Sequence, residues 1–170
     1  MDTAKTAPPG GGFAPINRDV VVTNRSGGAL AVGDVVEFDL DTAASDEAET
    51  TTTLPYTAEG TSAYNNVVAP TATGFVDGGC AGAVVLEAIA DNATGLVRLE
   101  GVVQAFVIAA SGSPIPRSLL VPTTSKNLDL VHAAGEALVA RCLEDVATPT
   151  TRTLAWVEFH GITPLGFQET

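Results

Sequence analysis

The chain has 170 residues, of which 45% are hydrophobic and only 5% aromatic, and its 8 basic and 20 acidic residues give a formal net charge of −12. This length fits one domain, which buries enough surface to fold without a metal or a disulfide. Nucleic acids and anionic membranes attract clustered cations, so the charge argues against both as partners. Simple solvation is an equally good explanation of the acidity.

Residues 1–17 predict an extended N-terminal arm. A Pro-Pro-Gly-Gly-Gly run at 8–12 supports neither helix nor ladder. Phe13 and Ile16 are large apolar side chains of this segment, and we expect them to dock on a neighbouring protein; a disordered tail is the alternative. No signal-peptide pattern and no apolar run of about 20 residues is present, which favours synthesis in a cytoplasm-like compartment.

The next segment predicts two strands joined by turns. Residues 19–24 are expected to form a strand because positions 20–23 are β-branched, and glycines at 27–28 and 33 mark the turns that follow. Residues 34–40 alternate, with Val36 and Phe38 facing one way and Glu37 the other. We expect this second strand to be antiparallel and half-buried.

Residues 41–60 predict a long acidic and Thr-rich loop, DTAASDEAETTTTLPYTAEG. Loops of this length are usually functional or mobile. Since no basic residue lies between Arg25 and Arg98, one side of the molecule is expected to be acidic. The carboxylates could attract calcium, but their spacing is not that of an EF-hand loop, so no metal is predicted.

The remaining strands follow at short intervals. They are expected at 67–68, 75–76, 83–90, 95–109, 118–121, 136–145 and 153–160. Gly101 predicts a bulge or bend in the longest of them. In the last strand, Leu154, Trp156, Glu158 and His160 share one face.

The two halves of the chain also resemble each other. Residues 20–38 and 105–121 each contain an apolar strand, a Ser-Gly turn, an aliphatic residue and a second apolar strand. Ser26 and Ser111 are 85 positions apart, as are Leu30 and Ile115, which we interpret as equivalent anchors.

About nine short strands with turns every few residues indicate an all-β, mainly antiparallel fold. We therefore expect residues 18–170 to form a single compact β-sandwich or barrel.

The sequence offers few reactive groups. It has no nucleophile elbow, phosphate-binding loop or dinucleotide fingerprint. His132, Cys142 and His160 are too widely spaced to predict a zinc site, and Cys80 and Cys142 are expected to be buried thiols. Carboxylates at 87, 100 and 158 are expected on solvated faces. We predict no catalytic residue, no metal and no cofactor.

Aromatic residues suggest one alternative. Trp156, Phe159 and Tyr64 would make a sugar-binding platform if the fold brought them together. They serve equally well as core or interface anchors.

Two segments carry a resemblance to a known family. NRSGGALAVGDVVEFDL at 24–40, then a variable loop, then GLVRLEGVVQAFV at 95–107, resembles the small capsid decoration, or cement, proteins of tailed bacteriophages. The resemblance covers roughly residues 20–161. It implies a β-rich protein on the outside of an icosahedral head, made in the host cytoplasm, that strengthens contacts between major capsid proteins, in some cases as a homo-trimer or beside neighbouring copies.

On this hypothesis the protein is not an enzyme, and its contacts come from the arm. Phe13 and Ile16 would pack on the capsid, and Arg18 and Arg25 would orient the protein, since aromatic and Arg side chains dominate interfaces. A carbohydrate- or host-surface-binding β-module is the first alternative, and a hydrolase with convergent carboxylates is the second.

Overall fold

A computed structural model describes residues 17–38, 66–70, 81–109, 112–130, 137–147, 150–161 and 166–167. Phe13, Ile16, the loop at 41–60, the strand expected at 75–76 and Cys80 lie outside these residues. All regular secondary-structure elements in the described residues are β-strands, so the all-β prediction is confirmed. The strands are β1 (Arg18–Asn24), β2 (Val35–Phe38), β3 (Asn66–Val68), β4 (Gly82–Val85), β5 (Thr94–Val107), β6 (Leu119–Pro122), β7 (Leu128–Leu130), β8 (Ala137–Leu138), β9 (Ala140–Cys142), β10 (Thr153–His160) and β11 (Gly166–Phe167).

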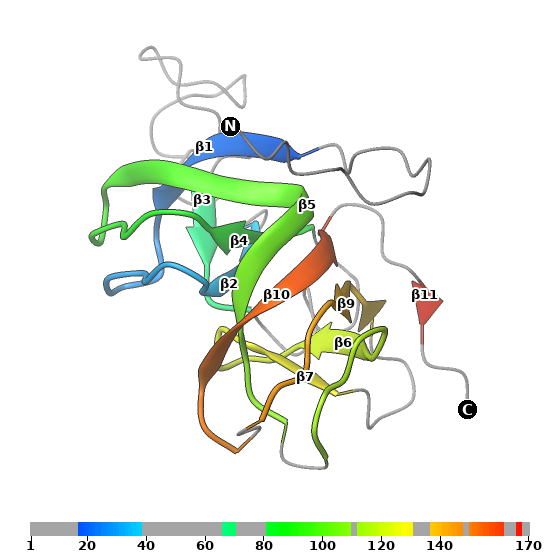
Figure 1. The fold of residues 1–170 in the computed structure, drawn as a ribbon. Helices are drawn as coiled ribbons and strands as arrows, with labels where there is room; N and C mark the ends of the chain where they lie inside the picture. The colour runs from blue at the N-terminus through cyan, green and yellow to red at the C-terminus, as the bar shows by residue number, and fades with distance from the viewer. Residues whose placement is uncertain are drawn as a thin grey trace, which may run out of the picture.

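The strands form two closed circuits that share β5. The first barrel runs β1-β3-β2-β4-β5 and closes through β1–β5 pairing, and the second runs β5-β10-β9-β6-β7 and closes through β5–β7 pairing. In Figure 1 the long strand β5 passes between the two groups, with β1 to β4 around its first half and β6, β7, β9 and β10 around its second. The pairings are antiparallel except β1–β3 and β5–β7, as the mainly antiparallel prediction requires.

β5 serves both barrels because its alternation is unbroken. Every second residue from Gly95 to Val107 is buried, and the residues between are more exposed. The strand β5 pairs with β1 up to Glu100 and with β10 from Glu100 onward. Figure 1 shows that β5 bends along its length, and φ at Gly101 is +115°, a conformation that favours glycine.

Each barrel has its own hydrophobic core. Side chains of β1 to β4 and the first half of β5 fill the first, and those of β6, β7, β9, β10 and the second half of β5 fill the second. Val35 and Val84 are cross-strand partners in the first barrel but pack into the second core. β2 and β4 are therefore buried on both faces, which explains their near-continuous apolar sequences.

This packing corrects one prediction. β2 was expected to be half-buried, with Glu37 toward solvent, but all four of its residues are buried, Glu37 included. The second barrel covers the face of β2 that the alternating pattern assigned to water.

The internal repeat is real in the strands, but its predicted anchors are misaligned. Leu30 is buried and exchanges backbone hydrogen bonds with Ile89, whereas Ile115 is 57% exposed. In the first half, Leu30 O accepts a hydrogen bond from Ile89 N. The equivalent acceptor in the second half is Pro114 O, which accepts from Val146 N at 2.9 Å.

The turns that follow these anchors give the correct alignment. Asp34 N donates to Ala31 O, and Ser118 N donates to Ile115 O. The true offset at the turn is therefore 84 positions, and Ile115 matches the exposed Ala31.

Candidate interaction site

The outward face of β10 presents apolar side chains to solvent. Inward-facing Ala155, Val157 and Phe159 are fully or almost fully buried, while Trp156 on the opposite face is 45% exposed. Leu154 on the same face and Leu143, just after β9, are exposed as well. Leu143 N donates to Trp156 O at 2.9 Å, so Leu143 and Trp156 belong to adjacent segments. The strand alternation predicted this common face.

A shallow groove of about 210 Å³ lies beside Trp156. Its walls come from both barrels. The first barrel contributes Val32, Val85, Leu86 and Arg98, and the second contributes Val103 and Gln104 of β5 and Trp156 of β10. Trp156 and Gln104 are cross-strand partners. The groove thus forms where β5 passes from one barrel to the other.

The Val32 side of the groove is held by a tight turn. Gly33 has φ +89°, and Ala31 N donates to the Asp34 carboxylate at 2.9 Å. A side chain on Gly33 would collide with Leu154, so the turn packs directly on the β10 face. Val32, at the tip, is exposed.

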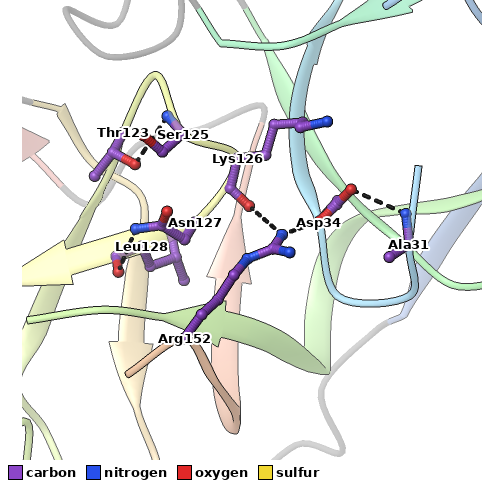
Figure 2. Close-up of polar contacts among 8 residues, drawn as sticks. All are labelled: Ala31, Asp34, Thr123, Ser125, Lys126, Asn127, Leu128 and Arg152. Atoms are coloured by element: carbon purple, nitrogen blue, oxygen red, sulfur yellow. Dashed lines mark hydrogen bonds and ion pairs between the residues drawn. The ribbon is translucent and has the colours of Figure 1, made fainter. Parts of the chain in front are cut away.

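Arg152 fastens this turn to the second barrel. Its guanidinium donates to the Asp34 carboxylate and, at 3.4 Å, to the carbonyl of Lys126, which lies in the turn between β6 and β7 (Figure 2). It also lies 3.7 Å above the centroid of the Phe106 ring. The Asp34 side chain is almost wholly buried, which places this ion pair between the barrels rather than on an open surface.

Arg98 is fixed at the other wall. Its guanidinium makes two hydrogen bonds to the Asp19 carboxylate, at 2.7 and 2.9 Å, and donates to Val102 O. The hydrogen bond with Arg98 holds the pKa of Asp19 below its ordinary value, and the same bond raises the pKa of Arg98. Arg98 therefore shapes the groove with its charge already matched.

Carboxylates flank the exposed indole. Glu144 Oε1 accepts a hydrogen bond from Trp156 N at 2.8 Å. Glu158, two residues along the same face of β10, pairs with Arg141 at 3.3 Å and lies 3.7 Å from His160 Nε2. The surroundings of Trp156 are thus apolar at the centre and acidic at the edge.

Two of the predicted contact residues are described, and the fold does not bring them together. Arg18 begins β1 and Arg25 follows its last residue, so their Cα atoms lie about 23 Å apart along an extended strand. Arg25 donates to Asn92 Oδ1 at 2.7 Å, across the mouth of the first barrel. Arg18 is exposed opposite Glu100. They mark the two ends of β1.

Phe159 and Trp156 do not share a face, so Phe159 is a core anchor and not part of the sugar-binding platform considered as an alternative. Phe159 is fully buried on the face of β10 opposite to Trp156, and Tyr64 lies outside the described residues. Sequence reasoning also missed Val32 and Leu143 as exposed neighbours of the groove. The turn signal at Gly33-Asp34 was visible, but which side chain it displays depends on packing between the barrels.

Reactive groups are few in this part of the molecule. Burial raises the pKa of the Cys142 thiol, and this cysteine is buried as predicted. Over the described ranges, no three His, Cys, Asp or Glu side chains gather as a metal site would require. No helix long and apolar enough to cross a membrane occurs among the same residues.

In comparisons with known proteins, no family model matches the chain, and no curated protein matches its sequence.

Proposed function

We propose that this chain is a non-enzymatic structural protein that binds the outer surface of an icosahedral phage head and stabilises contacts between its major capsid proteins. The resemblance of residues 24–40 and 95–107 to decoration proteins supports the proposal. The second of these segments is β5, and the first spans the groove-forming turn and β2. The segments that carry the resemblance are therefore those that join the barrels and build the groove.

The observation that carries the proposal is the exposed apolar face around Trp156. Charged residues are usually depleted from the centre of an interface, and aromatic side chains are enriched there. Here a Trp and two Leu side chains lie in solvent on a body that has two complete cores of its own. These side chains contribute little to folding, and a partner protein would give them a role.

The mechanism is one of linkage. A protein that binds the assembled lattice and not free subunits adds its binding free energy to the stability of the lattice. Many copies on one particle make modest individual contacts sufficient. On this mechanism the chain acts at the virion surface as single copies, neighbouring copies or a homo-trimer, and it needs no cofactor.

The test uses purified protein and undecorated heads. We expect saturable binding at a fixed number of copies per particle and a higher temperature of head disruption. A variant lacking residues 1–17 measures the share of Phe13 and Ile16, and Arg18→Ala and Arg25→Ala measure the two arginines. Failure of the intact chain to co-sediment with heads at any concentration would exclude this function.

A carbohydrate-binding role is the second candidate. Trp156 offers an exposed ring beside the Gln104 amide and the fixed Arg98 guanidinium, a combination that suits stacking and hydrogen bonding to a sugar. A glycan array with the intact chain and with Trp156→Ala would separate the two functions. Selective glycan binding that requires Trp156, without head binding, would favour this second role.

A further inference from the structure

We infer that the groove beside Trp156 is a docking site for a Lys or Arg side chain carried on an apolar, extended segment of the partner protein. This inference rests on the proposed function and specifies which surface makes the contact and what chemistry it recognises. It places the contact where the two barrels meet, on residues that do not include Arg18 or Arg25.

The first argument is the apolar surface around the groove. Val32, Leu143, Leu154 and Trp156 are all more than a third exposed, and they come from the groove-forming turn, the end of β9 and β10. The hydrogen bond from Leu143 N to Trp156 O and the packing of Leu154 against Gly33 connect them in one surface. An extended segment with alternating apolar residues would cover this surface.

The second argument is the charge at the edge of that surface. Glu144 is bound to the backbone N–H of Trp156, and the exposed Asp145 follows it directly. Neither carboxylate has a Lys or Arg ion pair among the described residues. Glu144 therefore leaves negative charge next to Trp156, and Asp145 adds a second carboxylate one residue further along the chain.

The nearby cations do not offset this charge. Arg141 is matched by Glu158, and Arg98 by Asp19. The pKa of Arg98 is raised and that of Asp19 lowered, as expected for a matched pair. An anionic partner group would find no unmatched guanidinium at the groove.

The third argument is the ring itself. Trp offers the best side-chain face for a cation, and Arg or Lys over an indole combines that attraction with apolar contact from its methylene stem. Within the molecule, Arg152 already lies over the Phe106 ring in this way. The exposed face of Trp156 with carboxylates beside it presents the same chemistry to a partner.

Charge also decides against the other occupants. A second copy of this chain would bring another net charge of −12 toward an acidic rim, and a nucleic acid would bring phosphates. A cationic segment gains from both the ring and the rim. The turn held by Asp34 and Arg152 sets the groove in place before binding, which limits the entropy lost on contact.

The chain has one tryptophan, so its fluorescence reports on this site alone. The probe is a nine-residue peptide with two Leu and two Arg in a Gly/Ser background, and the matched control peptide has Glu in place of Arg. We expect the Arg peptide to change Trp156 emission saturably and the Glu peptide to leave it unchanged. Binding should weaken by about tenfold or more between about 0.05 and 0.5 M salt, because the attraction to the exposed carboxylates is screened.

Variants then assign the signal. By calorimetry, Trp156→Ala should weaken the Arg peptide about tenfold, equivalent to about 1.4 kcal/mol, and Glu144→Gln combined with Asp145→Asn should remove most of the salt dependence. Val21→Ser is the matched control, because Val21 is 58% exposed on β1 and is not a lining residue of the groove. Equal binding of the Arg and Glu peptides, or a Trp156 signal that follows protein concentration alone, would overturn the inference.

Head binding separates this inference from the function it rests on. Heads that bind the intact chain and Trp156→Ala equally well would reject the docking site and keep the proposed function. A chain that binds the Arg peptide through Trp156 but binds no heads would keep the site and reject the function.

Discussion

The two barrels contain the same kind of hydrogen bond, from a strand N–H to a glutamate carboxylate, but the residue that donates it differs between them. In the first barrel, Leu96 N donates to Glu87 Oε1, and Leu96 O accepts from Leu86 N. In the second, Trp156 N donates to Glu144 Oε1 in the same way, at the same 2.8 Å. The hydrogen bond is repeated, but the half-buried Leu96 in the first barrel corresponds to the exposed Trp156 in the second.

The outward faces of the barrels differ in the same sense. Val35 and Val84, on the outside of the first barrel, are buried in the second core, whereas the outward face of β10 stays in solvent. Substitutions on the first face should therefore affect folding, and substitutions on the second should affect binding. Four predictions test this division, in order of decreasing effect.

The largest effect is expected from a charge between the barrels. Val84→Asp places a carboxylate where the side chain is fully buried, and should cost more than about 4 kcal/mol of unfolding free energy. Trp156→Asp, on the outward face of β10, should cost less than about 3 kcal/mol, because Trp156 is already 45% exposed. Urea titration of both variants compares the two faces; similar losses would mean that β10 does not have a free face.

The second prediction concerns the close approach that joins β4 to the end of β10. Gly82 N donates to Gly161 O, Gly161 N donates to Leu99 O, and a Cβ on Gly161 would collide with the Gly82 carbonyl. Gly161→Ala should cost about 1–3 kcal/mol, since backbone must move to accommodate it. Gly28→Ala, with open space at the Cβ, is the control for thermal unfolding, and equal losses would contradict the prediction.

The third prediction concerns the ion pair between the barrels. Arg152→Ala leaves the buried Asp34 carboxylate with fewer donors and should cost about 1–2 kcal/mol, because Arg152 itself is partly screened by solvent. Arg141→Ala removes a pair in which both side chains are partly exposed and should cost less than about 1 kcal/mol. Chemical denaturation ranks them; the reverse order would show that Asp34 does not depend on Arg152.

The smallest effect is a pH dependence in the first barrel. The pKa of Asp19 is lowered by Arg98 in the folded state, so the pair stabilises the fold above the ordinary Asp value of 3.8 and loses that contribution as pH falls through the folded-state pKa. The contribution should be below about 1 kcal/mol for this partly exposed pair. Asp19→Asn should reduce the fall in unfolding free energy between about pH 5 and about pH 2, as measured by urea titration at several pH values. If the variant loses as much stability on acidification as the natural chain, Asp19 is not the source of that loss.

Local pattern predicted most of the strands. β1, β5 and β10 have strong alternation or β-branched content, and β10 spans the predicted residues 153–160. The strand expected at 136–145 corresponds to the two short strands β8 and β9. These elements are determined by side chains that are near one another in the sequence.

The contacts between barrels were not predictable in this way. The burial of Glu37 and the exposure of Val32 both depend on how β2 and its preceding turn meet the second barrel, more than 60 residues away in sequence. The pairing of Asp34 with Arg152 is equally non-local.

The shared strand β5 has a mechanical consequence. Because one continuous backbone belongs to both closed circuits, a force applied to either barrel is transmitted along covalent bonds and the ladders on both sides of them. Separating the two halves would require tearing hydrogen bonds from β5 rather than opening a linker. Relative motion of the two barrels is therefore limited by the stiffness of a paired strand and not by the length of a connecting loop.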